Sequence, residues 1–509
     1  MIKREHPGWP LILCLAFLKF ILPLFQQDPQ FELQRDEFLY YQQGLHPDLG
    51  YLENPPLLSY LGAISSWFGG SESWIKFWPC LFGAATVVVT CLIAAELGGK
   101  LFAQFLAALG VSTGAFVRVH YLFQPNFLDI FFWTLALYFV IRFIQTKDHR
   151  FIFYLMVSLA LGWWSKYSIF FIGMAILLGF VLSAHRSVLI KKQSWLALLL
   201  GLVIVLPNLF WQYNHNWPLL THMKELKETQ LRLIKKSDFI IDQFMMLMPA
   251  LVLWLSGVVW LLRQAAWRIL PIIYFSVIMF LLFGSGKGYY ALGVYPMLIA
   301  AGAVCWERIT GKRIWIRYVF TTIIIFLNWL IMPMLLPIWK PGKLEAFYKK
   351  IGIEHKWEDQ QNHSLPQDYA DMLGWKELTQ KLERFYTTLP AAAKENTIIL
   401  GRHYGHAGAI KFYTKDRQLA EKTYTDVGSF LLWIPDSIQF RNIILIARRM
   451  PDKDDKVFRH FENRTIIDSV TNPYSRQLGD KIIYFESLDS SGYRIAIEDL
   501  RKMKKQFNQ

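Results

Sequence analysis

Residues 74–97 read WIKFWPCLFGAATVVVTCLIAAEL, an apolar run whose only charged residues are Lys76 and Glu96. A helix needs about 20 apolar residues to cross the hydrocarbon core of a bilayer. The run is long enough and apolar enough to predict a transmembrane helix, which indicates that the chain is a membrane protein.

Similar runs continue on both sides of this stretch, and about eleven segments qualify as transmembrane helices by length and hydropathy. They cover residues 8–25, 74–97, 101–121, 123–144, 151–165, 168–185, 195–213, 243–262, 268–284, 289–306 and 314–336. Residues 56–70 are also apolar, and we expect a re-entrant or interfacial helix there. The first run follows Lys3 and Arg4 and lacks a small-residue cleavage site, which predicts an uncleaved first span.

The composition supports a membrane protein. Of the 509 residues, 54% are apolar and only 18% are charged, against roughly 25% charged in soluble domains. The mean hydropathy is +0.26. These values exclude a disordered, collagen-like or disulfide-scaffold protein. The four cysteines lie in apolar segments and form no CxxC pair, so we expect them to act as small buried hydrophobic residues.

The chain carries 54 basic and 39 acidic residues, a net charge of +15. No basic stripe alternates with aromatic residues, so the excess predicts basic loops beside an anionic bilayer and no nucleic-acid partner. The even-numbered loops, counted from the N-terminus, hold most of the cations. Because loops on the cytoplasmic side are rich in Lys and Arg, this pattern predicts that the N-terminus lies in the cytoplasm. The loop at 214–240 breaks this pattern and is expected to form an amphipathic helix on the membrane surface.

Charged residues concentrate after about residue 340, which divides the chain into a membrane domain at 1–339 and a soluble domain at 340–509. An odd number of spans places the second domain outside the cytoplasm, on the periplasmic side in a bacterium. An α/β fold is predicted for it. The expected strands are 397–400, 429–434, 442–448, 465–470 and 481–486, and the expected helices include 376–386 and 455–462.

The first external loop, residues 26–73, carries the candidate chemistry. Residues 34–60 read QRDEFLYYQQGLHPDLGYLENPPLLSY, so Asp36 and Glu37 follow the first span almost at once. Carboxylates at a membrane face are costly and usually functional. One of them could accept the proton of an acceptor hydroxyl during group transfer. The alternative is a solvated loop that starts a helix, with Asp36 near the positive end of that helix.

The loop resembles that of the GT-C class of lipid-dependent membrane glycosyltransferases, which includes protein O-mannosyltransferases and lipid A aminoarabinose transferases. The resemblance extends over about the first 310 residues. It rests on Asp36-Glu37, Tyr40-Tyr41, Gly50-Tyr51, Pro55-Pro56-Leu57, residues 133–138, Ser165-Lys166-Tyr167, residues 287–290 and Tyr295-Pro296. Residues 404–410, YGHAGAI, look like the accessory domain of bacterial members.

The resemblance implies a GT-C fold and specific roles. Asp36 occupies the position of the catalytic base, and Glu37 completes the acidic pair. Glu53 matches a second acid that precedes Pro-Pro in the aminoarabinose transferases. Those enzymes have lysine where this chain has Asn54, which argues against aminoarabinose as the sugar. Lys166 matches a lysine near the donor phosphate.

The residues support a phosphate-bearing donor independently. A cation at the membrane surface would stabilise the negative charge that develops on a leaving phosphate. Lys166 and Lys287 are isolated lysines at external helix ends, flanked by aromatic residues, and the alternative is that they extend to lipid headgroups. Residues 284–288 lack the GxxxxGK[ST] spacing, so no nucleotide site is predicted there.

Further candidates lie at the same external ends. Arg118 is a candidate for substrate binding. Asp129, an acid within an apolar segment, is a further functional candidate, with helix capping or pairing with Arg118 as the alternatives. Five tyrosines are candidates to stack on the sugar or line the donor groove, with an interfacial aromatic belt as the alternative. They are Tyr40, Tyr41, Tyr51, Tyr289 and Tyr290.

The sequence therefore predicts a polytopic α-helical membrane glycosyltransferase with a C-terminal α/β domain. It would move a sugar from a polyprenyl-phosphate donor to a hydroxyl of a lipid, glycan or protein acceptor, with inversion, at the outer face of a bacterial inner membrane. No cofactor or metal is predicted, because no HExxH or paired Cys/His spacing occurs. The alternatives are a lipid-linked-sugar transporter and a non-catalytic membrane scaffold.

Overall fold

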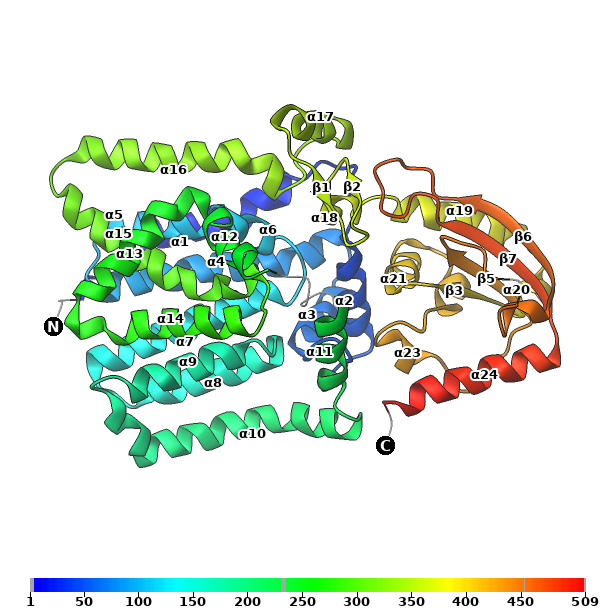
Figure 1. The fold of residues 1–509 in the computed structure, drawn as a ribbon, viewed down its shortest axis with the longest axis horizontal. Helices are drawn as coiled ribbons and strands as arrows, with labels where there is room; N and C mark the ends of the chain where they lie inside the picture. Colours follow the sequence, from blue (N-terminus) through cyan, green and yellow to red (C-terminus); the bar gives the residue numbers. More distant parts are fainter. Residues whose placement is uncertain (1–3, 230–234, 453, 508–509) are drawn as a thin grey trace.

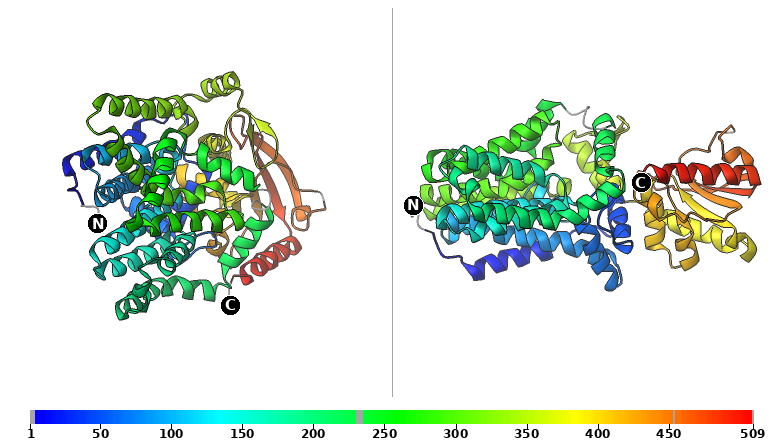
Figure 2. Two further views of the ribbon diagram at one scale, coloured as in Figure 1. Left: turned by 60° about the vertical axis from the view of Figure 1, so that its left-hand side comes forward. Right: turned by 90° about the horizontal axis from the view of Figure 1, so that it is seen from below.

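The computed structural model describes residues 4–229, 235–452 and 454–507. A bundle of helices forms one end of the molecule and a domain with a mixed β-sheet forms the other (Figure 1). The N-terminus lies at the end of the bundle farthest from the sheet domain, as the view from below in Figure 2 also shows. The two parts meet around α2 (Arg35–Leu45), the short helix that follows the first apolar helix (Figure 1).

The bundle is that of a multi-pass membrane protein. Within the described residues, five helices are long and apolar enough to cross a membrane. They are α4 (Glu72–Glu96), α7 (Asn126–Thr146), α10 (Lys192–Asn214), the segment Gly288–Thr310 and α16 (Ile314–Leu335). A pair of helices bent by 68°, α12 (Lys236–Met245) with Met248–Arg263, is long and apolar enough only when taken together, as a broken span or a re-entrant loop.

Shorter apolar helices occupy the remaining predicted segments. They are Trp9–Phe25 (α1, Trp9–Ile21, with η1, Leu22–Phe25), α5 (Leu101–Val111), α8 (Arg150–Ser165), α9 (Ile169–Val181) and α14 (Ile269–Phe283). The segment Gly288–Thr310 consists of η6 (Gly288–Val294) and α15 (Tyr295–Thr310), and the bent pair ends in η4 (Met248–Ala250) and α13 (Leu251–Arg263). Short turns η2 (Arg186–Ile190) and η5 (Ala265–Trp267) connect neighbouring helices.

The prediction of one continuous span over residues 101–121 is wrong. Helix α5 ends at Val111, and a second short helix, α6 (Ala115–Val119), follows Gly114. Gly114 has φ +59°, and a Cβ there would lie 2.4 Å from the Met246 carbonyl oxygen. Its amide donates to Asn328 Oδ1 at 3.0 Å. The apolar pattern does not reveal this break, because only the packing of distant segments demands it.

Three short helices lie where the bundle meets the sheet domain (Figure 1). They are α2 (Arg35–Leu45), α3 (Leu57–Trp67) and α11 (Pro218–Thr229). Helix α3 lies within residues 56–70, where a re-entrant or interfacial helix was expected. The loop at 214–240 forms α11 and the start of α12, and its residues 230–234 lie outside the described part.

The C-terminal domain contains a five-stranded sheet in the order β4-β3-β5-β7-β6. Strand β3 pairs in parallel with β4 and β5, and β7 pairs antiparallel with β5 and β6. The central register places Ile399 opposite Ile444 and Ile444 opposite Tyr484. The strands are β3 (Thr397–Gly401), β4 (Thr423–Tyr424), β5 (Asn442–Ala447), β6 (Phe461–Ser469) and β7 (Lys481–Leu488).

Helices cover both faces of this sheet. Alternating residues divide between the faces, because successive strand side chains point to opposite sides. Ile399, Ile444 and Tyr484 pack with the face of α19 (Trp375–Thr388) and α21 (Tyr404–Tyr413). Ile443 and Phe485 pack with α24 (Ser490–Lys505). The remaining elements are α17 (Pro341–Ile351), β1 (His355–Lys356), β2 (Asn362–His363), α18 (Gln367–Ala370), α20 (Ala391–Glu395), α22 (Arg417–Glu421), α23 (Phe430–Trp433) and η7 (Phe458–His460).

Two local predictions in this domain are wrong. Residues 429–434 form helix α23 instead of a strand, and residues 455–462 contain only the turn η7 before β6 begins. A short apolar run fits either a strand or a buried helix. Here Phe430 packs against Leu39 of α2 instead of joining the sheet.

Candidate active site

Asp36 lies in the first turn of α2 with its side chain 24% exposed. Its Oδ1 accepts hydrogen bonds from Tyr404 Oη at 2.5 Å and from Arg35 Nε at 3.2 Å. Its Oδ2 accepts one from Gln124 Nε2 at 3.2 Å. Each carboxylate oxygen can accept about two hydrogen bonds. Among the described residues, Oδ2 is therefore the oxygen with an acceptor position left for a substrate hydroxyl.

Glu37 points elsewhere, although it is the next residue. It is fully buried, and Lys76 Nζ lies 2.7 and 2.6 Å from its two carboxylate oxygens. The backbone amides of Phe123 and Gln34 also donate to it, at 2.7 and 2.8 Å. Neighbouring helix positions do not share a face. Glu37 therefore anchors α2 to α4 and to the segment before α7.

A chain of hydrogen bonds connects Asp36 to Lys166. Gln124 donates to Asp36, Asn126 Nδ2 donates to Gln124 Oε1 at 3.2 Å, and Lys166 Nζ donates to Asn126 Oδ1 at 2.7 Å. Lys166 lies in the turn between α8 and α9, with its ammonium 4.3 Å from the centre of the Tyr290 ring. Burial lowers the pKa of Lys166 to about 8, which shows that its surroundings compensate its charge only in part.

Lys287 and Tyr40 belong to the same cluster. Burial lowers the pKa of Lys287, while the charges of Glu358 and Asp36 oppose that shift. Burial raises the pKa of Tyr40 well above its usual value, and the negative charges of Asp36 and Glu53 add to the effect. Tyr289 lies against Tyr290 with ring centres 4.8 Å apart, and the Lys166 ammonium is 5.3 Å from the Tyr289 ring. The hydrogen-bonded chain thus links Asp36 to Lys166 and its two tyrosines, and the charge of Asp36 also acts on Lys287 and Tyr40. Together these residues form the Asp36 cluster.

Glu53 binds a loop of the sheet domain. Its carboxylate accepts hydrogen bonds from Ser429 N at 2.7 Å, from Ser429 Oγ at 2.5 Å and from Gln43 Nε2 at 3.1 Å. Gly428 has φ +63°, and a Cβ there would lie 1.9 Å from Glu53 Oε1, so only glycine fits. Burial raises the pKa of Glu53, and the hydrogen bonds from Ser429 partly oppose this.

Two of the predicted tyrosines lie outside the Asp36 cluster. The Tyr51 hydroxyl is 2.9 Å from the carbonyl oxygens of both Gln43 and His46, and the residue is 2% exposed. Tyr41 packs edge-on against Phe412 of α21. Both side chains hold the first external loop in shape.

Arg118, a third predicted binding residue, also contacts groups outside the Asp36 cluster. It forms an ion pair with Asp368 at 3.0 Å and donates to the carbonyls of Met334 and Leu335. The expected alternative pairing of Arg118 with Asp129 is wrong. Asp129 Oδ2 instead accepts a hydrogen bond from Ser168 at 2.8 Å.

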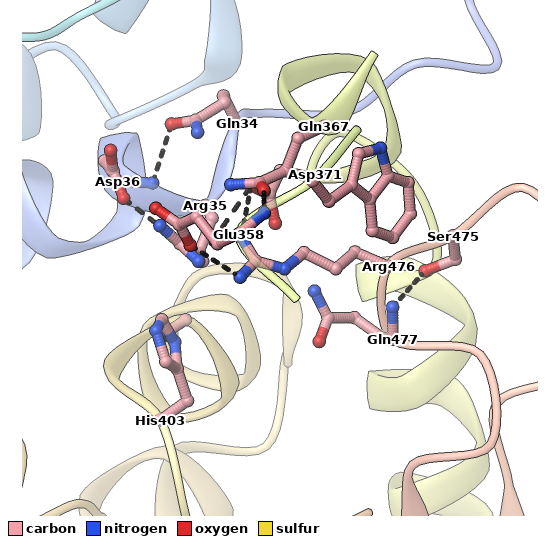
Figure 3. A network of polar contacts seen from close by, with 12 residues as sticks. Gln34, Arg35, Asp36, Glu358, Gln367, Asp371, His403, Ser475, Arg476 and Gln477 are labelled. Carbon is pink, nitrogen blue, oxygen red and sulfur yellow. Dashed lines mark hydrogen bonds and ion pairs between the residues drawn. The ribbon is translucent and has the colours of Figure 1, made fainter. Parts of the chain in front are cut away.

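The sheet domain brings further polar residues to α2 that the sequence did not indicate (Figure 3). The buried Asp371 lies 4.0 Å from Arg35 and 3.1 Å from Arg476, and Arg476 pairs with Glu358 at 3.0 Å. Burial raises the pKa of Asp371 to about 6. Arg35 therefore bridges Asp36 to this network. Across the described residues, no group of three or more His, Cys, Asp or Glu side chains could hold a metal ion.

Glu32, just before α2, is expected to make stability pH-dependent. Its Oε2 accepts the amides of Trp375 at 2.8 Å and Lys376 at 3.1 Å, and burial raises its pKa to about 7. The folded state then binds more protons than the unfolded state between roughly pH 4.5 and 7, so stability falls as the pH rises through that window. We expect a loss of about 1–3 kcal/mol.

Thermal unfolding of the wild type and Glu32→Gln at pH 5 and pH 8 checks this expectation. The variant should show the smaller difference between the two pH values. Equal pH dependence in both proteins would contradict the assignment to Glu32.

Comparisons with known proteins agree with this architecture. A family model described as dolichyl-phosphate-mannose-protein mannosyltransferase matches residues 53–211. A lipid A galacturonosyltransferase, RgtD of Rhizobium johnstonii, is 22% identical over 246 residues, which are 47% of this chain and 51% of that protein. The chain thus matches about half the length of this curated relative.

Solved structures extend the similarity to nearly the whole fold. The structure of ArnT from Cupriavidus metallidurans bound to undecaprenyl phosphate matches with a TM-score of 0.63 at 12% identity, covering 94% of this chain and 98% of that one. An Archaeoglobus fulgidus oligosaccharyltransferase tethered to an acceptor peptide matches with a TM-score of 0.52 at 12% identity, covering 82% and 63%.

The chain therefore has the GT-C fold of polytopic membrane glycosyltransferases, as the first external loop predicted. Within that class, residues 53–211 carry the sequence pattern of the mannosyltransferase family named above.

Proposed function

We propose that the protein is a membrane glycosyltransferase that moves a sugar from a polyprenyl-phosphate donor to a hydroxyl of a lipid, glycan or protein acceptor. The observation that carries the proposal is the hydrogen-bonded chain from Asp36 to Lys166, both of which are half-buried. It joins a base to a cation, which are the two groups that the reaction needs. The names of the relatives, a galacturonosyltransferase and an ArnT bound to undecaprenyl phosphate, support the same class of reaction.

In the proposed reaction, the acceptor hydroxyl gives its proton to Asp36 Oδ2. The acceptor oxygen bonds to the anomeric carbon while the bond from that carbon to the phosphate oxygen breaks. The polyprenyl phosphate leaves with the electron pair, and Lys166 and Lys287 stabilise its negative charge. Attack from the face opposite the phosphate inverts the anomeric carbon.

The remaining residues have supporting roles in this proposal. Tyr40, Tyr289 and Tyr290 line the donor groove beside the two lysines. Glu37 orients α2 through Lys76, and Glu53 holds the loop at Ser429 beside the groove. Tyr41, Tyr51 and Arg118 stabilise the loop and the contact between the domains. The sheet domain would lie on the extracytoplasmic face of a bacterial inner membrane, with the N-terminus in the cytoplasm.

Reconstitution tests the proposal. The purified full chain is placed in vesicles that contain polyprenyl-phosphate sugars and envelope acceptors extracted from cells lacking the gene. Mass spectrometry should show loss of one polyprenyl-phosphate sugar, release of polyprenyl phosphate and a glycosylated acceptor. Movement of the intact donor between leaflets without release of phosphate would favour a transporter and overturn the proposal.

The same assay tests metal independence, which is part of the proposal. We expect turnover to continue after treatment with a chelator. Loss of turnover that one divalent ion restores would overturn this part.

Replacing Lys166 by Met is expected to weaken donor binding. A half-buried cation that faces a phosphate contributes about 2 kcal/mol or more, so KM for the donor should rise roughly 30-fold. Lys343→Met is a matched control, because the Lys343 ammonium also lies over an aromatic ring, 4.2 Å from the centre of Trp339, but outside the Asp36 cluster. An unchanged KM in Lys166→Met would contradict the assigned role.

A further inference from the structure

Tyr404 of the sheet domain reaches the carboxylate of α2. Its hydroxyl donates to Asp36 Oδ1 at 2.5 Å, although 368 positions separate the two residues in the chain. Burial raises the pKa of Tyr404 well above its usual value, and the charge of Asp36 raises it further. The phenol therefore stays protonated and remains a donor.

The rest of the run YGHAGAI explains how the hydroxyl comes so close. A Cβ at Gly405 would lie 2.8 Å from Arg35 Cγ, and a Cβ at Gly408 would lie 2.7 Å from Phe38 Cβ. Glycine at these two positions lets α21 approach α2 closely. On another side of α21, His406 Nε2 lies 3.0 Å from the carboxylate of Asp480, the residue before β7, and fixes the helix beside that strand.

The geometry around Asp36 gives this contact a chemical consequence. Tyr404 and Arg35 together fill the acceptor positions of Oδ1, which leaves Oδ2 to face the acceptor. Two donors on one oxygen also fix the orientation of the carboxylate.

We propose that Tyr404 is a positioning residue for Asp36, so that the sheet domain completes the active site instead of merely covering it. This inference rests on the proposed function, since it assigns Tyr404 to the base of that reaction. It also gives residues 404–410 a role: the glycines allow docking, and the tyrosine orients the carboxylate.

The experiment compares Tyr404→Phe with Tyr413→Phe in the full chain. Tyr413 lies on the same helix and donates to Glu72 at 2.9 Å, away from Asp36, so its variant controls for the loss of a buried tyrosine hydroxyl. Without the Tyr404 hydroxyl, the Asp36 carboxylate loses one of the two donors that orient it through Oδ1. We therefore expect kcat to fall roughly tenfold with little change in donor KM.

The Tyr413→Phe control should keep the wild-type kcat and donor KM. A wild-type kcat in folded Tyr404→Phe would overturn the inference. If that variant fails to fold, 4-fluorophenylalanine at position 404 decides the question, because it retains the ring and fills the place of the hydroxyl without donating a hydrogen bond. We then expect the same loss of kcat with little change in donor KM, and an unchanged kcat would overturn the inference.

Asp36→Asn separates the two proposals. Wild-type protein that transfers no sugar would overturn the proposed function itself, whereas wild-type activity in Asp36→Asn would overturn the assignment of Asp36 as the base and with it the role of Tyr404. An inactive Asp36→Asn together with an unaltered Tyr404→Phe would overturn only the role of Tyr404.

Discussion

Replacing Asp36 by Asn is expected to lower kcat for sugar transfer roughly 1,000-fold, the scale of a lost general base. The substitution retains the shape of the side chain and an oxygen that can accept from Tyr404 and Arg35. The protein should therefore remain folded and inserted, and donor binding should change little. Steady-state kinetics, thermal unfolding and a donor-binding assay on the same preparation measure all three quantities.

Asp28→Asn is a suitable control for this experiment. Asp28 is another acid of the first external loop, and its carboxylate accepts from the exposed amide of Gln30 at 3.0 Å. Its replacement should leave kcat within about twofold of the wild type, since it removes no catalytic group. Equal activities of Asp36→Asn and Asp28→Asn would contradict the assignment of the base.

Replacing Lys76 by Met is expected to give a large loss of stability. The substitution leaves the fully buried Glu37 carboxylate without its cation and removes the contact of the Lys76 ammonium with the Tyr121 ring at 4.4 Å. Breaking one side of a buried ion pair costs about 3–5 kcal/mol. Chemical or thermal unfolding of the detergent-solubilised protein measures the loss.

Two further variants show whether the buried pair causes this loss. Lys376→Met breaks the more exposed pair with Glu72, at 2.9 Å, and should cost about 0–1 kcal/mol. Adding Glu37→Gln to Lys76→Met removes the uncompensated charge and should recover part of the stability. Similar losses in Lys76→Met and Lys376→Met would show that the Glu37–Lys76 pair is not an anchor of α2.

The sequence predicted the positions of most apolar helices in the bundle, because a long apolar run is a strong signal, and five of these helices are long enough to cross a membrane. It did not predict the break at Gly114, which depends on the approach of Met246 from a distant segment. It also did not predict helix α23, since its apolar run serves to contact Leu39 of α2 and resembles a strand by composition.

The candidate site was predictable only in part. The sequence predicted Asp36 and Glu37 as one acidic pair, but the two acids lie in different surroundings because successive helix residues point about 100° apart. Lys166 and Tyr290 were predicted as separate candidates, and the structure places them in contact. The partners Lys76 and Tyr404 could not be assigned, because nothing in the local sequence indicates a contact across 39 or 368 positions.

The most direct test of the central claim is the lipid-linked sugar content of cells. Mass spectrometry would compare cells with the wild-type gene, a deletion or Asp36→Asn. We expect the deletion and Asp36→Asn to accumulate the same polyprenyl-phosphate sugar and to lack the same envelope decoration. A wild-type lipid profile in cells with Asp36→Asn, beside an altered profile in the deletion, would contradict catalysis by this carboxylate.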